Sequence, residues 1–320
     1  MLTKSNSQQT PSALASGQQF VLNLLTPNGL LHAAIASRGA SLREFSLGDI
    51  ELVEPYDADS HAPLCAGKIM SPWVNRLDHG QWNFGGEVLQ NPITLTEQDN
   101  ANHGLLLDYL YKEVESSPTA VTLEAVIEPT EGYPFHVVTR VTYALVADGL
   151  VVTHHAENLA GVAAPYATGA HPYFKFSTVD AADLTVKLNA ATRTVVDSRQ
   201  IPIGEEAAAL AGYDLASGVR AGDQHIDEDF TDLARDENGL AHTYVSSADG
   251  RGLDIWQDEH FAHVVLFTPS FFPTIDGGRT HAVAVEPSTA APNAFNSGKN
   301  LIWLEPGARF EARWGVRVVI

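Results

Sequence analysis

Hydrophobic and polar residues alternate along several stretches of the chain. The clearest stretch lies near the C-terminus, where apolar side chains occupy every second position from Phe310 to Val318 and charged residues fill most positions between them. The same period of two runs through residues 121–127 and 137–145. Because this period places successive side chains on opposite faces of an extended chain, it predicts strands that are buried on one face.

Turn signals separate these stretches and indicate the fold class. Segments that contain Gly or Pro lie at residues 128–132, 147–149, 248–250, 276–278 and 305–307, and such segments favour reversals of the chain. Many short strands joined by turns are typical of an antiparallel sandwich or barrel. Strands do not alternate with helical patterns, which argues against a parallel α/β sheet. The sequence therefore predicts an all-β protein.

The expected architecture has one domain and one short helix. The sequence has no repeat of fixed period and no low-complexity linker. We therefore expect residues 18–320 to form a single β domain, preceded by a flexible lead-in at residues 1–17. Residues 205–212 combine glutamates, alanines and a leucine before Gly212, which predicts a short helix that ends at the glycine.

Composition narrows the class of partner. The formal net charge is −20, from 39 acidic and 19 basic residues, so nucleic acid and anionic membranes are poor partners. A neutral small molecule fits this charge better. No apolar run reaches the roughly 18 residues of a membrane span, and the first residues lack the apolar region of a secretory signal. The single cysteine, Cys65, rules out a disulfide framework and is expected to be a small buried residue. These features favour a cytoplasmic location.

Two histidines lie in segments that favour a functional role. His103 stands between Asn102 and Gly104, in a turn-like segment and not within a strand pattern. His171 precedes a proline, which favours an extended backbone, and Tyr173 follows it closely. An imidazole beside an aromatic ring suits a sugar pocket. Taken as an isolated residue, His103 is more often structural and tied to the backbone, whereas His171 is equally compatible with a structural, hydrogen-bonded role.

A glutamate supplies the candidate base. Glu286 follows the apolar stretch 282–285 and precedes a proline, so it lies at the end of a predicted strand. A partly desolvated carboxylate has a raised pKa and is a better base near neutral pH. The alternative is a solvated acid at the end of a strand.

Other motifs that would indicate metal or cofactor chemistry are missing. His154 and His155 are adjacent, so on a strand they point to opposite faces. The acidic residues 223–229 lack the spacing of a calcium-binding loop. The sequence contains no zinc-protease motif, nucleophile elbow, phosphate loop or dinucleotide fingerprint. We expect neither a metal nor a cofactor.

Several segments, in this order, resemble the aldose 1-epimerase (galactose mutarotase) family. They are residues 71–77 (Ser-Pro-Trp-Val-Asn-Arg-Leu), 102–104 (Asn-His-Gly), 132–135 (Gly-Tyr-Pro-Phe), 169–174 (Gly-Ala-His-Pro-Tyr-Phe), 226–230 (Ile-Asp-Glu-Asp-Phe), 286–287 (Glu-Pro), 292–296 (Pro-Asn-Ala-Phe-Asn) and 304–307 (Leu-Glu-Pro-Gly). The sequences of residues 169–174 and around Glu286 resemble those of a bacterial subgroup that includes sulfoquinovose-associated mutarotases.

The resemblance implies a large antiparallel β-sandwich of the galactose mutarotase type and a cofactor-independent isomerase that interconverts the α and β anomers of a free aldose. It also implies site residues. Glu286 would be the general base, His171 the general acid and His103 an assistant at the ring oxygen. Sugar-binding roles would fall to Arg76, Asp227, Asn102 and Tyr173. Asp229 competes with Asp227 for its role. A monosaccharide is the expected partner, and the expected assembly is a monomer or homodimer.

Other readings of these residues stay open. A glycosidase would use two carboxylates, such as Asp227 and Glu286, and would leave the histidines without a role. A hexose-phosphate epimerase would need several basic residues for the phosphate, whereas Arg76 stands alone among the motifs. A non-catalytic sugar-binding regulator would keep the aromatic platform, for which Trp73 and Trp256 are further candidates. The mutarotase interpretation requires that Glu286 and His171 open onto one shared cavity.

Overall fold

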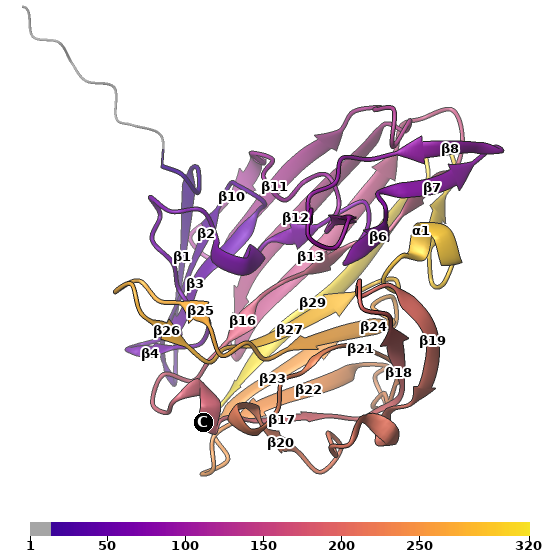
Figure 1. Ribbon diagram of the computed structural model, residues 1–320. Helices are drawn as coiled ribbons and strands as arrows, with labels where there is room; N and C mark the ends of the chain where they lie inside the picture. Colours follow the sequence, from indigo (N-terminus) through magenta and orange to yellow (C-terminus); the bar gives the residue numbers. More distant parts are fainter. Residues whose placement is uncertain (1–13) are drawn as a thin grey trace, which may run out of the picture.

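The computed structural model describes residues 14–320, and strands dominate this part of the chain (Figure 1). Three antiparallel sheets form the body of the molecule, with four, nine and eight strands. The eight-stranded sheet lies across the nine-stranded sheet, and the N-terminal four-stranded sheet lies at one end of the pair. The predicted all-β class and the large antiparallel β-sandwich are confirmed.

In spatial order, the four-stranded sheet consists of β1 (Gln19–Thr26), β2 (Gly29–Ala36), β3 (Ser41–Leu47) and β4 (Ile50–Glu51). The nine-stranded sheet consists of β10 (Lys112–Ser116), β11 (Ala120–Ile127), β12 (Val137–Val146), β13 (Gly149–Asn158), β29 (Arg309–Val319), β23 (Gly252–Gln257), β22 (Ala241–Ser246), β17 (Thr185–Leu188) and β20 (Val219–Arg220). The eight-stranded sheet consists of β19 (Pro202–Ala207), β18 (Ala190–Val196), β21 (Asp227–Leu233), β24 (His263–Phe267), β27 (Val283–Ser288), β15 (Gly169–Ala170) and β5 (Ile69–Met70), with β16 (Tyr173–Phe174) also paired to β27.

Smaller elements complete the described part. The two-stranded ribbons are β6 (Arg76–Asp78) with β9 (Asn100–Asn102), β7 (Gln81–Phe84) with β8 (Glu87–Gln90), β14 (Ala164–Tyr166) with β28 (Ile302–Leu304), and β25 (Phe272–Pro273) with β26 (Arg279–Thr280). The helical elements are the 3₁₀ turns η1 (Pro63–Cys65), η2 (Ala181–Asp183), η3 (Ala208–Ala211) and η4 (Ala221–Asp223), and the one-turn helix α1 (Ala294–Ser297). No helix within residues 14–320 has the length and apolar character needed to span a bilayer.

The period-two patterns of the sequence correspond to strands with one buried face. Strand β11 alternates strictly, with Val121, Leu123, Ala125 and Ile127 buried and the residues between them partly exposed. Strands β12 and β29 follow the same rule over most of their length. Their apolar faces join those of the eight-stranded sheet in one hydrophobic core. Burial of this shared face is the main favourable contribution to the sandwich.

The eight-stranded sheet differs because its second face is also buried. On β27, Val283 and Val285 enter the core between the sheets, so Ala284 and Glu286 point to the opposite face. Part of that face meets the segment that carries β6 and β9, because Arg76 and Asn102 line one cavity with Glu286. Polar residues that alternation would place in solvent are therefore enclosed, and they need partners within the protein.

The helix predicted at residues 205–212 is wrong in its first part. Residues 205–207 belong to the edge strand β19, where Glu205 pairs with Thr194 and Glu206 with Arg193. Pairing with the neighbouring strand outweighs the helical preference of these residues, as tertiary context commonly does. Only η3 is helical, and Gly212 ends it with φ of 86° in the left-handed region.

The predicted lead-in lies mostly outside the described residues, which begin at residue 14. Within its described remainder, Ser16 is buried and its hydroxyl donates a hydrogen bond of 2.6 Å to the carbonyl of Ala58. The packed part of the chain therefore begins before residue 18.

We predict that neighbouring substitutions on β11 differ sharply in cost. Leu123→Ala empties a fully buried position and should lower the free energy of unfolding by about 2–5 kcal/mol. Thr122→Ala removes a 2.9 Å hydrogen bond to Thr142 on the outer face and should cost about 1 kcal/mol or less. Urea denaturation with the m-value monitored measures both. Equal losses would mean that the two faces of the sheet are not distinguished by burial.

Candidate active site

A cavity of about 230 Å³ lies between the eight-stranded sheet and the segments that cover it. It is lined by residues from β6, β9, β16, β21, β24 and β27 and from the turn η1. The structure brings all seven of the sequence-predicted site residues into its wall: Arg76, Asn102, His103, His171, Tyr173, Asp227 and Glu286. A volume of this size accommodates one monosaccharide ring.

Glu286 and His171 are in direct contact inside the cavity. The Nε2 atom of His171 lies 3.3 Å from Oε1 of Glu286, and the side chains are 7% and 3% exposed. Strand pairing sets this geometry. Gly169 of β15 pairs with Ser288 of β27, and Tyr173 of β16 pairs with Ala284 of β27. His171 lies between these two contacts, so it is held next to Glu286. The shared cavity expected from the sequence is present, and the two groups lie side by side in its wall.

Burial shifts the proton affinities of the pair in opposite directions. It raises the pKa of Glu286 well above its usual value, and the neighbouring carboxylate of Asp227 adds to this effect. It lowers the pKa of His171 to about 4. The raised pKa makes the Glu286 carboxylate a stronger base, and the lowered pKa makes a protonated His171 a stronger acid. At 3.3 Å, the charge state of each group affects the other.

The backbone around His103 is tightly specified. His103 has a positive φ of 58°, and Gly104 follows with φ of 82°. A Cβ atom on Gly104 would lie 2.0 Å from the carbonyl oxygen of Ser71, so only glycine fits there. The backbone N–H of His103 donates to the carbonyl of Asn75 at 2.8 Å. These contacts hold the imidazole against His171, with ring centroids 5.3 Å apart in an edge-to-face arrangement.

One hydrogen bond defines the tautomer of His103. Its Nδ1 accepts the backbone N–H of Asn75 at 3.2 Å, so Nε2 carries the proton of the neutral ring. Burial, together with the neighbouring His171 and Arg76, lowers the pKa of His103 well below its usual value. His103 is thus a neutral Nε2–H donor.

The same tautomer weighs against a metal centre. One ligand atom from each of His103, His171 and Glu286 lies within 4.8 Å of the others, a spacing that two imidazoles and a carboxylate could use for a cation. However, one nitrogen of His103 accepts a backbone hydrogen bond and the other carries the proton. Neither nitrogen then offers a lone pair. The donor set therefore fits an organic substrate better than a metal ion, and the expectation of no metal stays a prediction.

Arg76 and Asn102 come from opposite strands of one ribbon. They are directly paired in β6 and β9, so their side chains lie on the same face. Nε of Arg76 donates to Oε1 of Gln98 at 2.8 Å, and Nη1 donates to Oδ1 of Asn75 at 3.1 Å. Among residues 14–320, Oδ1 of Asn102 has no hydrogen-bond partner although it is buried. An acceptor of this kind suits a hydroxyl group of a ligand.

Of the two competing aspartates, Asp227 is the one that lines the cavity. Burial raises its pKa, and the nearby guanidinium of Arg76 partly offsets this shift. Asp229 lies deeper, where its carboxylate accepts hydrogen bonds from Thr194 at 2.6 Å and from Nδ1 of His263 at 3.0 Å. The geometry favours Asp227 as the group that a ligand would contact.

Tyr173 forms a wall of the cavity and also supports a loop. Its ring lies 5.1 Å from that of His171 and 4.7 Å from that of Phe272, and its hydroxyl donates to the carbonyl of Leu64 at 3.1 Å. The other aromatic candidates lie elsewhere. Trp73 packs in the core against Phe295, and Trp256 lies under the guanidinium of Arg317 on the nine-stranded sheet.

Some lining residues carry no sequence signal of their own. Cys65 is half-buried in the cavity wall, where burial raises its pKa to about 11, whereas the sequence predicts a buried packing role. Leu95, Val265 and Phe267 supply further apolar wall. Asn75 could have been found from the sequence, since it precedes Arg76 within the same motif and bonds both Arg76 and His103.

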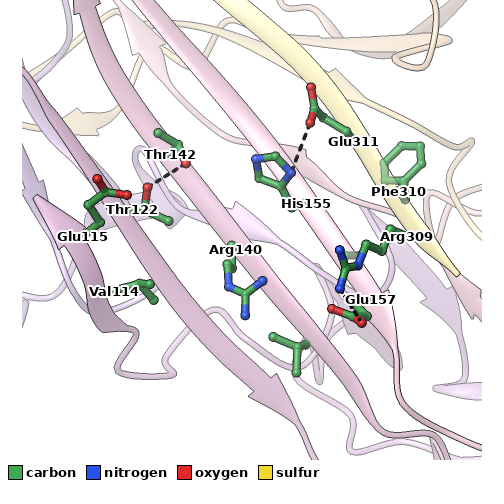
Figure 2. A pocket seen from close by; sticks show the side chains of 12 residues that line it. Val114, Glu115, Thr122, Arg140, Thr142, His155, Glu157, Arg309, Phe310 and Glu311 are labelled. Atoms are coloured by element: carbon green, nitrogen blue, oxygen red, sulfur yellow. Dashed lines mark hydrogen bonds and ion pairs between the residues drawn. The ribbon is translucent and has the colours of Figure 1, made fainter. Parts of the chain in front are cut away.

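A larger hollow of about 620 Å³ lies on the outer face of the nine-stranded sheet (Figure 2). Its charged side chains are paired with one another or with neighbours: His155 with Glu311 at 3.4 Å, Arg309 with Glu157 at 3.2 Å, and Arg140 with Glu124 at 2.7 Å. Their side chains are mostly half-exposed. This is a solvated sheet face, and it gathers no buried acid–base group.

Known proteins share the sequence pattern and the fold of this chain. A family model described as Aldose 1-epimerase matches residues 22–317. The uncharacterized protein YihR of Escherichia coli strain K12 is 30% identical over 287 residues, which cover 87% of this chain and 87% of YihR.

Solved structures share the fold at low sequence identity. The GalM/aldose epimerase homologue from C. elegans superposes with a TM-score of 0.79 at 18% identity, covering 95% of this chain and 100% of the other. A galactose mutarotase-like protein from Clostridium acetobutylicum gives 0.76 at 17% identity, covering 94% and 97%. Galactose 1-epimerase from Lactobacillus acidophilus NCFM gives 0.75 at 18% identity, covering 92% and 93%.

We predict that His103 stays neutral with its proton on Nε2 between pH 6 and pH 8, because burial lowers its pKa and Asn75 occupies Nδ1. Long-range ¹H–¹⁵N spectra of protein labelled at histidine report the protonation of each ring nitrogen. The His103→Asn variant assigns the resonance by its disappearance. A proton on Nδ1, or a doubly protonated ring, would contradict the assignment.

Proposed function

The chain belongs to the aldose 1-epimerase family, and from this premise we propose that it is a mutarotase, which interconverts the α and β anomers of a free aldose. One observation carries the proposal: Glu286 and His171 lie 3.3 Å apart in a cavity of monosaccharide size, with His103 against them. Anomer exchange needs a base at the anomeric hydroxyl and an acid at the ring oxygen, and these side chains supply both.

In the proposed reaction, Glu286 removes the proton of the C1 hydroxyl while His171 gives a proton to the ring oxygen. The C1–O5 bond breaks to give the open aldehyde, the C1–C2 bond rotates, and the reverse steps close the ring on the other face. Protons are conserved, because closure returns one to the hydroxyl and one to His171. The neutral Nε2–H of His103 hydrogen-bonds to the ring oxygen as its charge changes.

The reactive form has an ionised Glu286 and a protonated His171, although burial opposes both charges. Their separation of 3.3 Å offsets part of this cost, since opposite charges attract strongly in a site of low dielectric. The guanidinium of Arg76 also lowers the pKa of Glu286. An acid and a base each contribute about 10²–10⁴-fold, or about 5–11 kcal/mol together. This suffices for a reaction that already proceeds in water.

Arg76, Asp227 and Asn102 are proposed to bind the sugar hydroxyls. A guanidinium, a carboxylate and a free amide oxygen offer both donors and acceptors, and Tyr173 supplies an apolar face. Such mixed polar contacts around an aromatic wall are suited to a neutral ring that carries several hydroxyl groups.

A phosphorylated sugar fits the cavity less well. Among the described lining residues, Arg76 alone carries a permanent positive charge. Two of its donors are already engaged by Gln98 and Asn75, and its other neighbours include the carboxylates of Asp227 and Glu286. A dianionic phosphate would face these carboxylates with little compensation. This arrangement favours a free aldose over a hexose phosphate.

We predict that Glu286→Gln lowers kcat/KM for anomer exchange by at least about 10²-fold, because the amide cannot accept the proton, while sugar affinity changes only a few-fold. Freshly dissolved α-anomers of glucose, galactose and sulfoquinovose are followed by polarimetry or NMR, with the spontaneous rate subtracted. Glu115→Gln, on the outer face shown in Figure 2, is the matched control. Retained turnover in Glu286→Gln would remove it as the base. An inactive wild-type protein that binds sugar would identify a regulator instead.

We also predict that His171→Asn lowers kcat by about 10²–10⁴-fold and changes KM much less, because the lost group acts on the transition state. His155→Asn, at the half-exposed site paired with Glu311, should leave both parameters unchanged. Steady-state kinetics over a range of sugar concentrations separates kcat from KM. A large rise in KM with kcat preserved would make His171 a binding residue.

A further inference from the structure

The two halves of the cavity come from separate parts of the fold. The eight-stranded sheet carries Glu286 on β27 and Asp227 on β21. The ribbon of β6 and β9 carries Arg76 and Asn102, and His103 follows directly. The described ladder pairs join β6 and β9 to each other and to no strand of the eight-stranded sheet. The backbone links them on one side only, where β5 of that sheet leads into β6 and Ser71 forms a bridge with Gly104. On the other side, side-chain contacts add to this link.

Arg199 makes such a bridge. It lies in the turn that joins β18 and β19 of the eight-stranded sheet, about 100 residues from the segment that it contacts. Its guanidinium group donates to the carbonyls of Gln98 and Asp99 at 3.0 Å and to Oδ1 of Asn100 at 2.8 Å. It also contacts the end of β6 and the residue after it. Nη1 forms an ion pair with Asp78 at 2.8 Å and donates to Nε2 of His79 at 3.0 Å.

The bridge is specified from both ends. Asn100 is fully buried, and its Nδ2 donates to the carbonyl of Arg199 at 2.9 Å, so the contact runs in both directions. In the turn, Oδ1 of Asp197 accepts the backbone N–H groups of Arg199 and Ile201 at 2.8 and 2.9 Å. The Arg199 side chain is 29% exposed. A planar guanidinium with several donors in fixed directions defines a geometry that a flexible ammonium cannot.

The contact leads to the cavity in one further step. Gln98 accepts from Nε of Arg199 with its backbone carbonyl and from Nε of Arg76 with its side-chain oxygen. The position of Gln98 therefore depends on Arg199, and the orientation of Arg76 depends on Gln98. Leu95, from the same loop, forms part of the cavity wall.

We propose that Arg199 is a positioning residue: through Gln98 it orients Arg76 and holds the β6–β9 ribbon at a fixed distance from Glu286. This inference rests on the proposed function for its kinetic test. Arg199 does not line the cavity, so it acts only through the groups that it holds.

The test compares Arg199→Ala, Arg199→Lys, Gln98→Ala and the double variant Arg199→Ala/Gln98→Ala with the wild type. We expect Arg199→Ala to raise KM for the sugar about 5–50-fold and to lower kcat less than about 3-fold, because Arg76 contributes binding. Gln98→Ala should reproduce this effect and keep the other Arg199 contacts, so it remains informative if Arg199→Ala folds poorly. The double variant should raise KM no more than either single variant does, because the two residues act through the same chain of contacts.

Two controls separate positioning from a general loss of structure or charge. Arg140→Ala breaks an ion pair with Glu124 on the far face (Figure 2) and should leave KM unchanged. Arg199→Lys keeps the positive charge beside Asp78 but loses the planar guanidinium and its several donors, so this variant should behave like Arg199→Ala. Full rescue by lysine, or a KM in Arg199→Ala equal to that of Arg140→Ala, would overturn the proposal.

A spectroscopic readout works even without turnover. The Nε–H resonance of Arg76, assigned with Arg76→Lys, should shift and exchange faster with solvent in Arg199→Ala, since the acceptor on Gln98 is displaced. If the wild-type protein shows no anomer exchange, this measurement still decides the positioning role. An unchanged Arg76 resonance in Arg199→Ala would refute it.

Discussion

The contact between Glu286 and His171 is the interaction on which the site depends. An isolated buried carboxylate costs several kcal/mol, and both side chains are almost sealed from water. The guanidinium of Arg76 and the imidazole of His171, 3.3 Å away, can offset part of this cost, while Asp227 acts in the opposite direction. Stability alone would favour apolar residues at these positions. Under the proposed function, the pair is a base and an acid, and the burial that makes their charges costly also keeps them reactive.

That burial follows from the architecture of the eight-stranded sheet. Alternation gives every strand a second face, and in most of the nine-stranded sheet that face is solvated, as Figure 2 illustrates. In β21, β24 and β27 part of the second face meets the segment that carries β6 and β9, and the two enclose the cavity. Polar side chains such as Glu286 and Asp229 are enclosed as a consequence. The covering segment must therefore be both positioned and rigid, since it completes a polar cavity.

The sequence predicts where several strands lie, but it does not predict which strands pair or which distant loops meet. Period-two alternation identifies β11, β12 and β29 because one face of each strand is buried. It does not show that β29 lies between β13 and β23, since partner choice depends on the whole fold. The sequence of residues 205–212 favours a helix, yet the first three residues form part of strand β19 and pair with β18. Glu286 and His171 are recognisable from their own segments, whereas Gln98 and Arg199 gain meaning only when distant loops meet.

The strength of the base depends on how charges deeper in the sheet are balanced. Asp229, Val265 and Glu286 occupy one row across three strands, so the Asp229 charge raises the pKa of Glu286. His263 counters this charge. Its Nδ1 lies 3.0 Å from the Asp229 carboxylate and its Nε2 lies 3.0 Å from Oδ1 of Asn300, so acceptors face both ring nitrogens. Burial acts to lower the pKa of His263, but Asp229 and these hydrogen bonds raise it above its usual value. A close ion pair has a weaker field at a distance than a single charge. After burial itself, Asp227 and Arg76, which line the cavity, therefore have a larger effect on the pKa of Glu286 than Asp229 has.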